Sequence, residues 1–169
     1  AAFPKAVYLD LLEAELFKKG LEAIPKTKHF RDLDDNSARI SFYVELSMID
    51  LERASTSRAD AEKRKAAIES AEGWADKLKR EIDPSSVEAR FLTASVLHAK
   101  GDYVAATKEA EAADRSVDAP RHVRLQLLLS DLYFQMSQWG SASKALKKAL
   151  ILSPYSPLLK IRLAQTYLS

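Results

Sequence analysis

One continuous stretch, VRLQLLLSDLYFQMSQWGSASKALKKALILSPYS at residues 123–156, carries most of the information about the fold. Apolar side chains recur in it every three or four residues, first up to Gln135 and again from Trp139, and Pro154 closes the second run. This spacing predicts two amphipathic helices joined by a short turn. Because each helix has an apolar face to cover, we expect the two to pack together as an antiparallel hairpin.

The pattern of this hairpin recurs along the second half of the chain. Small residues stand at Ala94, Ser130 and Ala164, at intervals of 36 and 34 residues, and Leu97, Tyr133 and Tyr167 follow them three positions later. The second helices match at an interval of 36 residues, with the pairs Tyr103 and Trp139, Ala106 and Ala142, and Ala113 and Ala149. Small residues let two helices approach closely. A single hairpin leaves one face uncovered, so the repeat predicts hairpins that stack.

This pattern resembles the tetratricopeptide repeat, a helix pair with small and aromatic residues at fixed places and a Pro at its end. The copy at 123–156 has Leu129, Ser130, Tyr133, Trp139, Ala142, Leu146, Ala149 and Pro154 at the expected offsets. A second copy covers about 87–122, with Thr93 in place of Leu, and a third begins at Pro157. All three copies depart from the family at its first large residue, which is Arg90, Gln126 or Lys160 here. The helix from Pro157 either caps the array or opens a further repeat.

The resemblance implies an all-α fold, an α-solenoid of antiparallel helix pairs wound into a right-handed superhelix. It covers residues 86–169 and excludes the first half, residues 1–85, in which no repeat register is recognisable. Helical spacing there predicts helices over about 4–19, 37–54 and 57–82, with a long connection at 21–36. We interpret residues 1–85 as a divergent helical half, and degenerate repeats are one interpretation of it.

Local signals predict where the helices begin and end. Asp35 or Asn36 is expected to cap the second helix, while Ser57 with Asp60, and Ser85 with Glu88, have the spacing of a capping box. Turns are expected near Gly101-Asp102, Asp118-Ala119-Pro120, Gly140 and Pro154.

Composition and charge exclude several classes of protein. The net charge is +2, with 26 basic and 24 acidic residues, so no field of one sign attracts nucleic acid or an anionic membrane. No run of about 18 apolar residues occurs, so we expect no membrane span. The absence of Cys fits a reducing or an oxidising compartment equally well, and localisation stays open.

No pattern of catalytic or metal-binding residues is present. Four Gly in the chain provide no phosphate loop, dinucleotide fingerprint or nucleophile elbow. His29, His98 and His122 stand in three separate segments without metal-ligand spacing. Asp32, Asp34 and Asn36 imitate the start of a calcium loop, but the sixth position lacks Gly and the twelfth lacks Glu. We therefore predict no catalysis, no cofactor and no metal.

The resemblance also implies where a partner binds, because the first helices of such repeats line a concave groove that receives a peptide or a helix. The residues expected to line this groove are Phe91, Leu92, Ser95, Leu127, Leu128, Asp131, Phe134, Ile161 and Arg162. The set is mostly apolar and would suit an apolar or amphipathic segment. The alternative is that these residues belong to the core or are covered by the N-terminal helices.

Some family members hold a C-terminal carboxylate in this groove with Lys, Asn and Arg side chains. The corresponding positions here are Phe91, Ser95, Leu128, Leu158 and Arg162. Only Arg162 keeps the residue type of the family, and one guanidinium cannot reproduce the paired contacts. The ligand is therefore expected to be less anionic.

The predicted function is that of a protein-interaction scaffold or adaptor for a peptide or amphipathic helix. The alternative is a self-assembly module, in which exposed helix faces at the ends of the repeats pair with a second copy of the chain. RNA binding ranks third. The helix at 57–82 is basic, but acidic residues interleave with its Lys and Arg, and Trp74 is its sole aromatic residue.

Overall fold

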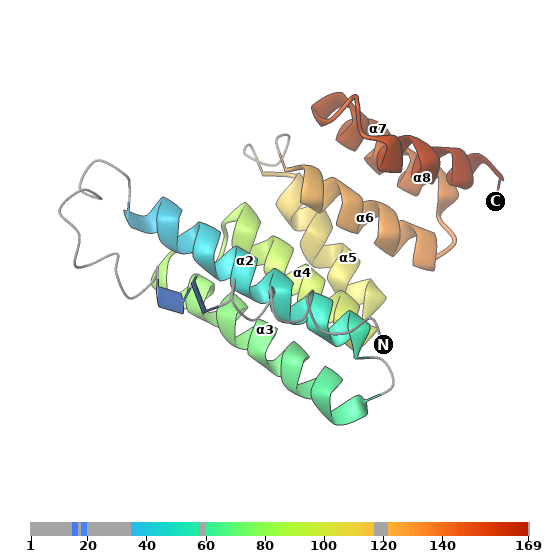
Figure 1. Ribbon diagram of the computed structural model, residues 1–169. Helices are drawn as coiled ribbons and strands as arrows, with labels where there is room; N and C mark the ends of the chain where they lie inside the picture. The colour runs from blue at the N-terminus through green and yellow to red at the C-terminus, as the bar shows by residue number, and fades with distance from the viewer. Residues whose placement is uncertain (1–14, 17, 20–34, 58–59, 117–121, 169) are drawn as a thin grey trace. The chain divides into compact units, whose positions relative to one another are not determined.

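The described part of the chain, residues 15–16, 18–19, 35–57, 60–116 and 122–168 of a computed structural model, is helical and contains no strand (Figure 1). It divides into two compact units, Ala1–Pro84 and Ser85–Ser169. The predicted helix at 4–19, the connection at 21–36 and the turn at 118–120 lie wholly or mostly outside the described residues. The all-α prediction is confirmed for the residues that the structure describes.

The first unit is a hairpin of two long helices, α2 (Asp35–Thr56) and α3 (Ala61–Glu81). Leu46 from α2 and Ala71, Ala75 and Leu78 from α3 are buried between 0% and 2% exposed. The buried hydroxyl of Ser47 also donates to the carbonyl of Ala71, 3.2 Å away. Small residues on α3 thus allow the close approach that the sequence pattern predicted for the second half alone.

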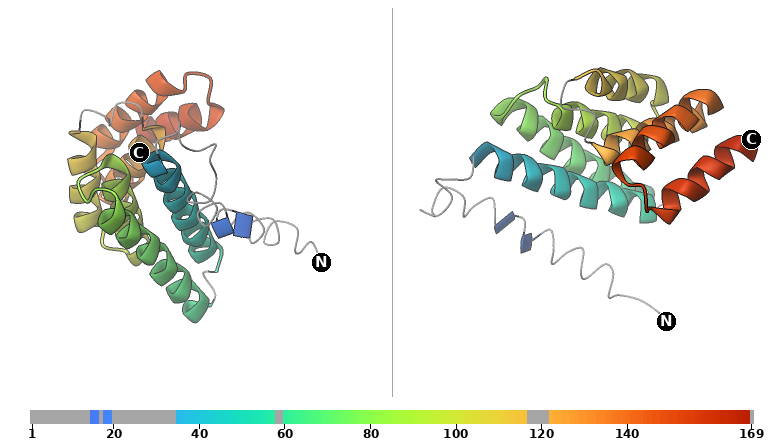
Figure 2. Two further views of the ribbon diagram at one scale, coloured as in Figure 1. Left: turned by 90° about the vertical axis from the view of Figure 1, so that its left-hand side faces the viewer. Right: turned by 90° about the horizontal axis from the view of Figure 1, so that it is seen from above.

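The second unit contains five helices: α4 (Val87–Lys100), α5 (Tyr103–Asp114), α6 (Val123–Gln135), α7 (Trp139–Leu152) and α8 (Pro157–Leu168). Consecutive helices pack on one another, with α4 against α5, α5 against α6, α6 against α7 and α7 against α8 (Figures 1 and 2). Most of the small residues predicted to lie where helices meet are buried: Ala94, Ala106, Ala113, Ala142 and Ala149 fully, and Ser130 at 3% exposed. The prediction is wrong for Ala164 of α8, which is exposed.

The repeat extends to the backbone of the turns. Gly101 has φ 88° between α4 and α5, and Ser137, which stands 36 residues later, has φ 58° between α6 and α7. Both residues therefore adopt the left-handed conformation that ends a helix. The turn predicted near Gly140 lies at residues 136–138, and Gly140 itself is the second residue of α7. A Ser does not indicate a left-handed backbone as a Gly does, so the sequence gives no reason to place the turn at Ser137. The nearest Gly, Gly140, therefore points to a position three residues too late.

Three predicted helix starts are also wrong by a few residues. The cap of α3 is Asp60, whose side chain accepts from the amide of Lys63, while Ser57 lies in the preceding turn. Ser86 rather than Ser85 caps α4, and α2 begins at Asp35 itself. The spacing of a capping box does not specify which of several nearby polar residues adopts the extended backbone conformation of a helix cap.

Replacing Ala142 by leucine tests the seam between α6 and α7. Ala142 is 0% exposed, so the larger side chain must displace packed neighbours, at a cost of roughly 1–3 kcal/mol in the free energy of unfolding. The control, Ala66→Leu, places the same side chain on an exposed position of α3 and should cost no more than about 0.5 kcal/mol. Chemical denaturation followed by circular dichroism measures both. Equal effects would contradict the close packing of α6 on α7.

Candidate interaction surface

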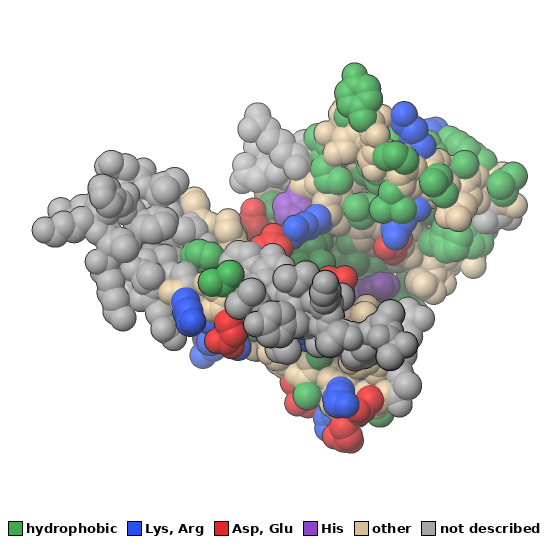
Figure 3. Space-filling view, in the orientation of Figure 1, with side chains coloured by type: hydrophobic (Ala, Val, Ile, Leu, Met, Phe, Trp, Pro, Cys, Tyr) green, Lys and Arg blue, Asp and Glu red, His purple; other side chains and the backbone are tan. Residues whose placement is uncertain are grey.

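The candidate surface consists of the exposed parts of α6 and α8 in the second unit. Leu128 is half-buried, Phe134 is 39% exposed and Ile161 is 57% exposed. Asp131 and Arg162 keep 44% and 35% of their side-chain surface accessible. Figure 3 shows hydrophobic side chains gathered over the part of this unit that contains α7 and α8.

An ion pair joins α6 to α8 in this surface. Nη1 of Arg162 donates to Oδ1 of Asp131 across 2.6 Å. The guanidinium charge is therefore already matched by a carboxylate from the protein itself. Arg162 is the one residue that the sequence shares with the carboxylate-binding members of the family, and its pairing further disfavours an anionic ligand.

Two contacts between aromatic rings lie in the second unit, one between α6 and α7 and the other between α4 and α5. The ring of Phe134 meets that of Trp139 edge-on at 4.6 Å between centroids, and the ring of His98 lies 5.6 Å from that of Tyr103. Burial lowers the pKa of His98 below its usual value, and the nearby charge of Asp131 partly opposes this shift. This lower pKa favours the neutral form of the His98 imidazole.

Three of the predicted groove residues are buried. Phe91 is 1% exposed, Leu92 0% and Ser95 6%, and the hydroxyl of Ser95 donates to the carbonyl of Phe91 within α4. The ring of Phe91 packs on the imidazole of His122, with 4.9 Å between centroids. These three side chains contribute to packing and offer no open surface, which corrects their assignment as accessible residues.

Leu127 also belongs to the packing rather than to an open surface. It is half-buried against a cluster formed by Leu146 and Ala149 of α7 and Leu159 of α8. Since Leu127 and Leu128 are adjacent on α6, they point in different directions. Leu127 faces α7 and α8, and Leu128 stays in the candidate surface.

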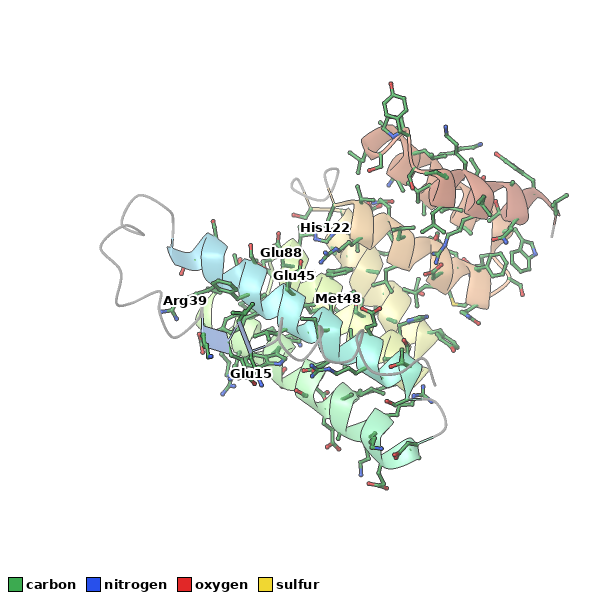
Figure 4. All side chains as sticks on the ribbon, in the orientation of Figure 1. Glu15, Arg39, Glu45, Met48, Glu88 and His122 are labelled. Atoms are coloured by element: carbon green, nitrogen blue, oxygen red, sulfur yellow. The ribbon has the colours of Figure 1, made fainter. Side chains whose placement is uncertain are left out.

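His122 has a structural role that sequence analysis did not specify. Its Nδ1 accepts a hydrogen bond of 3.1 Å from the amide of Leu125 and so caps α6 (Figure 4). Burial lowers its pKa, with a smaller opposite effect of Glu88. The neutral ring that this low pKa favours is also the form in which Nδ1 can accept. Within the described residues no group of His, Asp and Glu side chains could hold a metal ion.

A polar cluster in the first unit was missed by sequence analysis. Asp50 of α2 is 8% exposed and accepts hydrogen bonds from Ser70 at 2.6 Å and from Nε1 of Trp74 at 3.1 Å, both on α3. Arg53, one turn further along α2, pairs with the other carboxylate oxygen at 3.1 Å. The ammonium of Lys77 lies 4.2 Å from the centre of the Trp74 ring. The cluster joins α2 to α3, and charged residues at ordinary helical spacing gave no sign of it.

Comparisons with known proteins bear on the fold. No family model matches the sequence, and no curated protein does. Among solved structures, a thermophilic TPR protein from Thermus thermophilus is similar, with a TM-score of 0.65 and 21% sequence identity. The similarity covers 94% of this chain and 76% of that chain, so it extends into the half for which the sequence shows no register. The chain therefore has the fold of the tetratricopeptide repeats, as its resemblance to them predicted. In the described part of the chain, no helix has the length and apolarity to cross a membrane.

Proposed function

We propose that this tetratricopeptide-like helical array is a non-catalytic protein-interaction module that binds an amphipathic segment of a partner. The observation that carries the proposal is a surface on α6 and α8 that combines apolar and polar side chains. Phe134 and Ile161 are exposed in it, and the Asp131–Arg162 ion pair, whose charges balance each other, belongs to the same surface. Large apolar side chains in water favour a protein partner. Helical-repeat folds present such surfaces on rigid elements, which lowers the cost of ordering on binding.

The chemistry of the surface specifies the kind of segment. Leu128, Phe134 and Ile161 supply apolar contacts, whereas Asp131 can accept hydrogen bonds and Arg162 can donate them at the rim. An amphipathic helix offers apolar residues three or four positions apart, together with polar residues beside them. Phe134 is the side chain best suited to be an anchor, because aromatic residues contribute most at the centre of interfaces.

Selection of peptides against the purified chain tests the proposal even though the partner is unidentified. A displayed library of amphipathic peptides would be enriched on the wild-type protein, and the dissociation constants of the selected peptides would then be measured by calorimetry. We expect Phe134→Ala to weaken their binding. Val104, 76% exposed on α5, provides the control, since Val104→Ala lies outside the surface. Peptides that bind both variants as they bind the wild type would exclude this surface.

The variant Leu128→Arg separates binding from folding. Leu128 is half-buried, and a guanidinium there would stand in the apolar contact with the peptide. We expect a loss of at least about 2 kcal/mol in binding free energy, typical of a central contact, with little change in the melting temperature. The same calorimetry and a thermal melt measure the two effects. A large drop in melting temperature would show that Leu128 is covered within the protein, because an unpaired charge would then be buried.

A further inference from the structure

One side of α7 differs in composition from the corresponding side of α5. Its four residues stand at intervals that place them on one side of a helix, and are Lys144, Lys147, Lys148 and Ile151. Their counterparts 36 residues earlier, on α5 and at its C-cap, are Lys108, Glu111, Ala112 and Arg115. This side therefore carries charges of both signs on α5, whereas on α7 it is basic and includes one apolar residue.

The same side is accessible in both helices. On α7 all four residues are exposed, and Ile151 is 79% exposed. Lys108 and Arg115 are exposed as well, although α6 packs on α5. The exposure of Lys144 and Ile151 is thus a property of their place in the repeat. Since Arg115 occupies the place of Ile151, packing of the helices does not require an apolar residue there.

Positive charge is concentrated in this part of the chain. All 24 acidic residues precede residue 132, whereas residues 132–168 contain five basic residues. The net charge of +2 for the whole chain conceals this uneven distribution. Lys148 donates to Oδ2 of Asp114 across 2.7 Å. In the described part of the chain, Lys144 and Lys147 form no ion pair, so their charges face the solvent uncompensated.

A second apolar side chain lies just beyond the end of α7. Tyr155 follows Ile151 by four residues, in the turn before α8, and is 91% exposed. Side chains as exposed as these two project into the solvent and do not line a groove. Figure 3 shows Lys or Arg side chains between hydrophobic ones over the part of this unit that contains α7 and α8.

We propose that the α7 face, formed by Lys144, Lys147, Lys148, Ile151 and Tyr155, binds the surface of a membrane that contains anionic lipids. The ammonium groups attract the phosphates and carboxylates of the headgroups, and the lysine stems lie along the apolar boundary. Ile151 and Tyr155 insert at the level of the headgroups. Tyrosine is favoured there, because its ring is apolar and its hydroxyl is polar.

The projection of the apolar side chains favours a lipid surface over other anionic partners. A fluid lipid surface accommodates a projecting side chain wherever it inserts, whereas an acidic protein must present a pocket for each one. Single-stranded nucleic acid needs several aromatic rings for stacking, and Tyr155 is the single ring of the α7 face. Three lysines and two apolar residues are a small set, so the binding is expected to be weak and reversible.

Flotation of the purified whole chain with lipid vesicles tests this proposal. The chain should float with vesicles of phosphatidylcholine and phosphatidylserine and not with phosphatidylcholine alone, and less of it should float as the salt concentration rises. Lys144→Glu/Lys147→Glu should lower the partition coefficient at least about tenfold, because repulsion replaces attraction at two positions. Ile151→Ser should lower it at least about threefold, because an apolar insertion is lost.

The matched control is Lys63→Glu/Lys65→Glu on α3, which changes the net charge equally. The side chains of Lys63 and Lys65 are 77% and 70% exposed, and the control should leave the partition coefficient unchanged. Equal losses in both double variants would overturn the proposal, since they would show a response to net charge alone. A thermal melt of each variant verifies that the fold is retained.

Two further outcomes would also overturn the proposal. One is a wild-type chain that does not distinguish the two kinds of vesicle. The other is a chain that ignores both but binds polyglutamate through Lys144 and Lys147, which would assign the α7 face to an acidic protein. The inference goes beyond the proposed function and does not depend on it, because the candidate surface lies on α6 and α8 and its peptides are measured without lipid.

Discussion

Replacing Phe91 by alanine should lower the free energy of unfolding by roughly 3–5 kcal/mol, the usual cost of removing a buried aromatic ring. Phe91 is 1% exposed, and its ring packs on the imidazole that caps α6. The substitution would leave a cavity between α4 and the start of α6. Chemical denaturation followed by circular dichroism measures the loss.

Phe134→Ala is the matched control, because it removes the same side chain from a position that is 39% exposed. We expect a cost of about 1 kcal/mol or less, since Phe134 keeps one aromatic contact, with Trp139, and is otherwise partly in water. The two phenylalanines have equivalent roles in the groove predicted from the sequence. Similar costs for both would mean that Phe91 is not part of the packing that α4 and α6 share.

Asp50→Ala should destabilise the first unit by roughly 1–3 kcal/mol, because it leaves the hydroxyl of Ser70 and the indole N–H of Trp74 without their acceptor and Arg53 without its carboxylate. Asp50→Asn should cost less, since its amide oxygen can still accept. Each unit contains one of the two tryptophans, Trp74 and Trp139. In a Trp139→Phe background, the fluorescence of Trp74 during chemical denaturation therefore reports this unit alone.

The control for this variant is Asp76→Ala on α3. Asp76 also forms a helical ion pair, with Lys79 at 3.7 Å, but its side chain is 55% exposed. Exposed pairs contribute little, and we expect a change within about 0.5 kcal/mol. A cost for Asp50→Ala as small as this would show that the hydrogen bonds to Ser70 and Trp74 do not stabilise the pairing of α2 with α3.

The repeat in the second half could be predicted from the sequence, because closely packed helices require small residues at the contact and these residues recur at a regular interval along the chain. Only small residues let two helices approach at the seam, so Ala106 and Ala142 stand 36 residues apart and are both fully buried in the structure. The all-helical architecture and the helix pairs from Val87 onward were predicted from these equally spaced residues. In the first half small residues also lie between two packed helices, at Ala71 and Ala75, but these helices have 22 and 21 residues and are longer than every helix of the second unit.

The sequence by itself determined which residues repeat, and the tertiary structure decided which of them are accessible. Phe91 and Ile161 occupy equivalent places in the repeat, yet one is 1% exposed and the other 57%, because burial depends on which side chains pack against each position, and the ring of Phe91 lies against the imidazole of His122. Asp50 likewise resembles any surface carboxylate in the sequence, and only the packing of α3 on α2 brings Ser70 and Trp74 within hydrogen-bond distance of it. Periodicity is a property of one helix and can be followed along the chain, whereas exposure and hydrogen bonding depend on neighbours that are distant in sequence.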